Sequence, residues 1–223
     1  MRIAETKNTD HDAVPTSAAK IDACDGFSLI ELIVSMVLTL MILGVAVVTF
    51  SNALSTRERE SSKTDAITSA QAALNIMSRE IGNSGYGLSD NGLVTATAND
   101  SNGKRLHFRT NTDNDNYDTN SRGEDVTFYY DNATQSVVRY DAYPTPQISG
   151  IINRVSDVDF VYYDYAADGT ITTSTTTPSA NTGRIEIILT VRLPDVRAQP
   201  SNRTVTLKTD VTLRNSTYMQ KQY

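Results

Sequence analysis

Apolar residues dominate the chain from position 32 to position 50, a run of 19 positions without a charged side chain. At ~1.5 Å rise per residue, a helix of this length nearly crosses a hydrocarbon core of ~30 Å, and the residues from Phe27 onward supply the remainder. An ordinary secretory signal has a shorter apolar core, which is followed by small residues at a cleavage site. Here a polar leader ends at Gly26 and the apolar stretch comes after it. The pattern predicts a transmembrane helix over residues 27–50.

The helical period continues beyond residue 50 with a narrower apolar stripe. The charged run at 57–60 is typical of a solvated helix face, and no proline occurs from residue 16 to residue 143. We therefore predict one helix from residue 27 to residue 81, roughly 80 Å long, which ends near Gly82 and Gly85 because glycine tolerates the left-handed conformation of a C-cap. Residues 51–82 are expected to be its soluble half. Its stripe consists of Ala66, Ala70, Ala73, Leu74, Met77 and Ile81.

Alternating patterns replace the helical period after residue 86. Asn-Gly at 91–92 and 102–103 and Asp-Gly at 168–169 predict turns, and the threonine-rich stretch 170–182 is a strand or a loop. Apolar side chains share one face in four predicted strands: Val126, Phe128 and Tyr130; Val158, Phe160 and Tyr162; Ile185, Ile187, Leu189, Val191 and Leu193; and Val205, Leu207, Val211 and Leu213. The last two strands flank a proline-bearing turn at 194–200 and are expected to pair as an antiparallel hairpin. Residues 83–223 are thus predicted to form an antiparallel β-sheet domain with the long helix packed on it, which is an α+β fold.

Composition limits the classes of function. The chain has 223 residues, 39% of them hydrophobic, and a formal net charge of −6, which is enough for one membrane helix and one globular domain. The acidic balance argues against nucleic acid as the main partner, because phosphate binding needs clustered Lys and Arg. The single cysteine, Cys24, lies in the leader. A chain without the leader would therefore have no disulfide and no cysteine-bound metal.

Glu31 is the one charged residue inside the predicted span, and an ionisable group at that depth indicates a function. A Gly26–Phe27 bond, an acid at the fifth position after it and an apolar helix resemble the class III signal of type IV prepilins and type II secretion pseudopilins. The resemblance implies that a membrane prepilin peptidase removes residues 1–26 by cutting between Gly26 and Phe27 and then methylates the amine of Phe27. It also assigns Glu31 to filament assembly. A plain membrane anchor with a stray glutamate would not explain why these features occur together.

Charges beside this motif depart from the family's usual pattern. Asp22 and Asp25 precede the cut, where the family has Lys or Arg, and more basic residues follow the span (57, 59 and 63) than lie close before it. The positive-inside rule alone would place the amino terminus outside. Because the peptidase site faces the cytoplasm, we instead orient the leader towards the cytoplasm, with a single-pass helix in the bacterial inner membrane and a periplasmic carboxy-terminal domain.

The sequence after the helix is similar to PilW-type minor pilins. The resemblance rests on the run from Arg79 to Tyr86 at the helix exit, on the strand from Phe160 to Tyr165 before the Asp-Gly turn, and on the last strand, which ends at 211–215. It implies a structural subunit of a type IV pilus, in the tip or initiation complex, that supports twitching motility, adhesion or DNA uptake. Its partners would be other minor and major pilins, the prepilin peptidase and the inner-membrane assembly platform.

Two alternatives remain open at the level of sequence. A type II secretion pseudopilin of the J type has a related plan, and its location would be a pseudopilus. A membrane-anchored protein whose β-domain captures a periplasmic ligand is a different class, and an uncut amino terminus would favour it.

Candidate catalytic and metal-binding residues are few. His107 is the only histidine after the cut; no nucleophile is identifiable beside it, so we expect a surface or sheet-face histidine and no enzyme. Asp113, Asp115 and Glu124 fall at positions 1, 3 and 12 of an EF-hand loop, but a tyrosine at the fifth position and an aspartate in place of the glycine make a poor match. A solvated loop is the favoured interpretation, with weak Ca²⁺ binding as the alternative and no other cofactor expected.

Overall fold

A computed structural model describes residues 26–97, 100–114, 116–195 and 200–221. Helix α1 spans Leu29–Ile81, within the predicted range of 27–81. The chain divides into two compact units, Met1–Phe50 and Ser51–Tyr223. The second unit contains the carboxy-terminal half of α1, all the strands and the short helix α2 (Thr217–Gln220).

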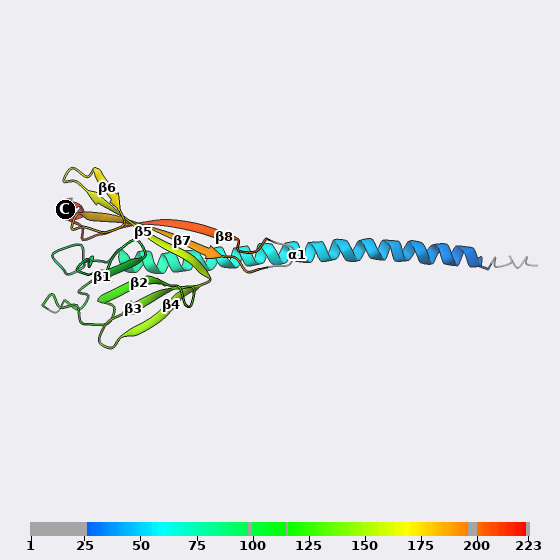
Figure 1. Cartoon of the computed structure of the whole chain (residues 1–223), viewed down its shortest axis with the longest axis horizontal. Coiled ribbons are helices and arrows are strands. Elements are labelled where there is room, and N and C mark those ends of the chain that lie inside the picture. Colours follow the sequence, from blue (N-terminus) through cyan, green and yellow to red (C-terminus); the bar gives the residue numbers. More distant parts are fainter. Residues whose placement is uncertain (1–25, 98–99, 115, 196–199, 222–223) are drawn as a thin grey trace, which may run out of the picture. The chain divides into compact units, whose positions relative to one another are not determined.

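The described residues include eight strands, which form two antiparallel four-stranded sheets that Figure 1 shows as separate groups of arrows. Sheet A is a meander in the order β1-β2-β3-β4 and contains Arg105–Arg109, Asp125–Asp131, Ser136–Asp141 and Gln147–Asn153. Sheet B has the order β6-β5-β7-β8 and contains Val155–Tyr165 (β5), Ile171–Thr175 (β6), Thr182–Arg192 (β7) and Thr204–Thr212 (β8).

The predicted antiparallel β-sheet domain thus consists of two sheets. One residue, Arg154, separates β4 from β5, and its φ of 59° lies in the left-handed region. This conformation redirects the chain, so that β5 starts a new ladder with β7 instead of continuing sheet A. The predicted β7–β8 hairpin is confirmed by a continuous antiparallel register in which Leu189 pairs with Leu207.

The apolar stripe of α1 packs as predicted. Ala70, Ala73, Leu74, Met77 and Ile81 are buried, and Ala66 packs partly buried against the same core. Alanines at 70 and 73 keep the helix surface flat, so the helix can approach large side chains from both sheets. Those facing side chains include Leu106, Phe108, Val126 and Phe128 of sheet A and Val158, Phe160, Ile185, Ile187 and Leu189 of sheet B.

Polar contacts connect the end of α1 to the rest of the domain. Arg139 on β3 donates from Nε to Glu80 on α1 (2.8 Å) and from Nη1 to the buried Asp141 (3.1 Å). Beyond the helix, Gly85 rather than Gly82 adopts the left-handed conformation (φ 77°). Asn215 Nδ2 closes this exit by donating to the carbonyls of Gly85, Leu88 and Asp90. The carboxy-terminal segment thereby fixes the loop after the helix.

Candidate processing and assembly segment

The Gly26–Phe27 bond lies just before the first turn of α1. The amide of Leu32 donates to the carbonyl of Ser28 (3.1 Å), so regular helical bonding begins after Phe27. Phe27 is 80% exposed, and a Cβ built on Gly26 would meet no heavy atom within 4 Å. The bond is therefore in accessible, non-helical backbone, as a protease site requires. Asp22, Cys24 and Asp25 lie outside the described residues.

Glu31 occupies the first turn of α1, and its side chain is exposed in the unit Met1–Phe50. A carboxylate in the first turn interacts favourably with the free amides of a helix amino terminus. Four residues separate Phe27 from Glu31, which is about one helical turn. If the leader is removed, the new ammonium at Phe27 and the carboxylate of Glu31 would thus be separated by about one turn along the helix axis.

The rest of the segment suits an apolar surrounding. Between Leu32 and Phe50 every side chain is exposed, and most are large and apolar. The three hydroxyl donors of Ser35, Thr39 and Thr49 are each bonded to a carbonyl three or four residues back, at 2.9, 2.7 and 2.8 Å. Polar groups in a membrane interior need hydrogen-bond partners within the protein, and these three hydroxyl groups have them. Among the described residues, α1 is the one helix whose length and composition would allow it to cross a membrane.

Residues 22–47 match the family model described as the prokaryotic N-terminal methylation motif. The match supports a pilin or pseudopilin. It covers Gly26, Phe27, Glu31 and most of the apolar stretch, and it leaves the β-domain unmatched. No curated protein and no solved structure gives a significant match to the chain. The motif and the apolar helix together fit a membrane-anchored, structural pilin-like protein.

His107 lies on a face of sheet A, in β1, which is the second of the two positions expected for it. Its side chain is only 14% exposed, and it is held between two carboxylates: Nδ1 lies 2.8 Å from Asp100 Oδ1, and Nε2 lies 2.7 Å from Asp125 Oδ1. Burial alone would lower the pKa of His107, but its hydrogen bonds with Asp125 and Asp100 outweigh burial and raise that pKa. Arg109 Nε donates to the other oxygen of Asp125 (2.8 Å).

The two carboxylates are shifted in the opposite direction. Burial favours the neutral acids, yet the bonds from His107 and Thr97 lower the pKa of Asp100, and those from His107 and Arg109 lower the pKa of Asp125. The nearby hydroxyl of Ser101 is bonded to the backbone carbonyl of His107 (2.8 Å), not to the imidazole. Both ring nitrogens are thus occupied, and we interpret the cluster as an ionic brace of sheet A rather than a catalytic base.

The outward direction of His107 could be read from the alternation in 105–109, but its partners could not. Asp125 becomes its neighbour because Phe108 pairs with Val126 across β1 and β2, and this register is not encoded locally. Asp100 arrives from the preceding loop, seven residues away along the chain.

The acidic loop places two of the three candidate calcium ligands close together. Glu124 is fully buried; its Oε1 accepts from Thr112 N (2.6 Å), Thr112 Oγ1 (3.0 Å) and Asp113 N (3.2 Å), and its Oε2 accepts from Ser121 N (3.0 Å). Asp113 Oδ2 accepts from Ser121 Oγ (2.6 Å). Asp115 lies outside the described residues. Within the described part of the chain, no group of three or more His, Cys, Asp or Glu side chains could hold a metal. Glu124 therefore organises its own loop, and weak calcium binding stays the untested alternative.

Proposed function

We propose that this chain is a structural minor pilin that joins the tip or initiation complex of a type IV pilus and thereby supports pilus assembly. The observation that carries the proposal is the N-terminal methylation motif over residues 22–47, which coincides with an exposed Gly26–Phe27 bond and a continuous helix. The PilW-like run at 79–86 supports the minor-pilin assignment. In the structure it forms the end of α1 and the start of the loop to which Asn215 donates hydrogen bonds.

In this proposal the leader faces the cytoplasm, and the peptidase cuts between Gly26 and Phe27 and methylates the new amine. The apolar part of α1 first anchors the subunit in the inner membrane, with the β-domain in the periplasm. It then enters the filament among other pilins through the assembly platform. The apolar side chains of 27–50 then exchange lipid for neighbouring helices, so close van der Waals packing rather than the hydrophobic effect favours their association.

Glu31 would select the position of a new subunit. Its carboxylate pairs with the methylated amine at Phe27 of a neighbouring subunit, since an acid in lipid without a partner is costly and docking removes that cost. A pair of unit charges about 4 Å apart gains about 4 kcal/mol at an effective dielectric near 20, before desolvation is subtracted. The net gain is therefore smaller, but it favours a single axial register.

The decisive experiment is mass spectrometry of the amino terminus of the protein purified from membranes and from sheared pili. We expect the chain to start at a methylated Phe27; removal of 26 residues from 223 leaves 197. Replacing Gly26 by leucine should block the cut, because glycine lets a peptidase approach the backbone closely. The open space around Gly26 means that this substitution leaves the fold intact. A protein that still begins at Met1 in the wild type would refute the proposal.

A further inference from the structure

Strand β4 is an exposed edge of sheet A. Within the part of the chain that the structure describes, only β3 pairs with it, and Figure 1 shows it as the outermost strand of its group. Its first four residues, Gln147 to Gly150, are exposed, and Ile148 is 69% exposed. A Cβ built on Gly150 would meet no heavy atom within 4 Å. The strand therefore offers an unpaired backbone edge, and its sheet face at Gly150 is open as well.

The other sheet edges are protected, whereas β4 is not. The outer side of β1 is covered by the preceding segment, in which Val94 N donates to His107 O (3.0 Å) and Arg109 N donates to Gly92 O (2.8 Å). Strand β8 carries the exposed charges Lys208 and Asp210, and β6 has only five residues. No charged residue occurs from position 142 to position 153, and no proline occurs within β4. An edge strand that has no covering segment, no charged side chain and no proline is a template for pairing with another strand.

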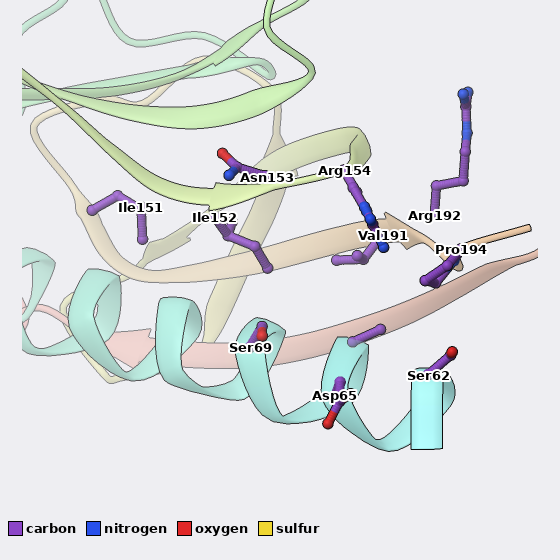
Figure 2. A pocket seen from close by; sticks show the side chains of 11 residues that line it. Ser62, Asp65, Ser69, Ile151, Ile152, Asn153, Arg154, Val191, Arg192 and Pro194 are labelled. Carbon is purple, nitrogen blue, oxygen red and sulfur yellow. The ribbon is translucent and has the colours of Figure 1, made fainter. Parts of the chain in front are cut away.

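The carboxy-terminal end of β4 opens onto a cleft of about 630 Å³ (Figure 2). Apolar side chains line part of it, including Ile151 and Ile152 of β4, Val191 of β7, Ala66 of α1 and Pro194.

The cleft also contains a positively charged side chain. Arg154 and Arg192 both contribute to its lining, but Figure 2 shows the side chain of Arg154 directed toward Val191 and that of Arg192 extending away from the other lining residues; Asp65 is the one acidic residue in the lining. Neither arginine forms an ion pair with any other residue that the structure describes. The backbone of Arg154 is fixed, because its carbonyl accepts from Arg192 N (2.7 Å). The cleft therefore favours a carboxylate that is attached to apolar groups.

We propose that β4 and this cleft bind an extended segment of another protein chain, whose acidic residue enters the cleft and whose following residues pair with β4 as a fifth strand of sheet A. An antiparallel partner, like every pair in this sheet, would have its amino-terminal end at Asn153, next to Arg154. The acid therefore precedes the pairing strand. A second copy of β4 fits poorly, because it has no acid over 142–153 to offer and Asp141 is buried. Strand addition gives affinity through the backbone, and Arg154 gives selectivity for the acid.

A synthetic peptide of β4 length can test this with the full chain in lipid nanodiscs. The probe is an acetylated peptide of alternating threonine and valine with an aspartate at its amino end, and the matched peptide has asparagine in that place. We expect saturable binding, slower hydrogen exchange of the β4 amides on binding, and an affinity for the aspartate peptide that is about threefold to tenfold higher. Arg154→Asn tolerates the left-handed conformation and should abolish this preference.

Ile148→Lys should weaken binding of both peptides by about tenfold or more, because it places a charge along the edge. The matched control is Ile171→Lys, since Ile171 is a 48% exposed isoleucine on the edge strand β6. It should leave binding unchanged, and both variants should keep the wild-type melting temperature. Equal effects of the two variants, or protection of β6 or β8 in place of β4, would overturn the proposal. So would β4 protection that rises with protein concentration without peptide, since the occupant would then be a second copy.

Discussion

Replacing His107 by leucine removes the central member of the Asp100–His107–Asp125 cluster while keeping a side chain of similar bulk. Each hydrogen bond to a charged group contributes about 1.5–3 kcal/mol, and the wild type has two. The loss is partly offset, because Asp125 keeps its bond from Arg109 (2.8 Å) and Asp100 keeps its bond from the amide of Thr97 (2.6 Å). We expect the free energy of unfolding to fall by about 2–4 kcal/mol at pH 5.5.

The pH dependence of this loss distinguishes an ionic brace from simple packing. Because the pKa of His107 is raised in the folded state, its stabilisation is complete below the unfolded pKa of about 6.5 and declines as pH rises through the folded pKa. Between these two pKa values, the wild type should lose up to about 1.4 kcal/mol per pH unit relative to the variant. The two carboxylates set the lower end of the pH range in which the cluster stabilises the fold. Because the pKa values of Asp100 and Asp125 are lowered in the folded state, the stabilisation that these residues provide is lost only as pH falls below about 4.

Urea unfolding of the full chain in detergent micelles, followed by the near-ultraviolet circular dichroism of tyrosine, measures this effect. The chain has 11 tyrosines and no tryptophan, and the first tyrosine is Tyr86, so the signal reports on the β-domain. Arg105→Leu, on the same face of β1, should retain the wild-type pH dependence. If the stabilities of the wild type and His107→Leu run parallel between pH 5.5 and pH 9, the cluster is not held by a protonated histidine.

Three further predictions concern the helix and the acidic loop. Met77→Ala, at a fully buried position of α1, should lower the free energy of unfolding by about 2–5 kcal/mol in the same urea assay, whereas Asn75→Ala on the exposed face should have little effect. Glu31→Gln should leave cleavage and membrane insertion intact but reduce recovery in sheared pili, with Glu31→Asp partly restoring it; recovery of Glu31→Gln at the wild-type level would exclude the charge-pairing role. Because Glu124 already accepts four hydrogen bonds, millimolar Ca²⁺ should not raise the melting temperature, and a clear increase in calorimetry would show that the loop binds the ion.

The local pattern of the chain determined the elements whose signals need no partner. The long apolar run and the stripe ending at Ile81 specify a helix and its buried side, and both appear in α1 as expected. The alternation in 185–193 likewise identifies β7 and its inner face. The candidate processing segment is also local, because a Gly26–Phe27 bond, Glu31 and the apolar run are adjacent in sequence.

The tertiary structure alone decided which distant residues meet. The split into two sheets depends on the left-handed backbone of Arg154. Arginine seldom adopts this conformation, and the sequence does not predict it. The His107 cluster depends on the register of β1 against β2 and on a loop that brings Asp100 into place. The unprotected edge of β4 exists only once the strand order is known. These features are set by non-local pairing, whose energy comes from contacts between segments rather than from any one of them.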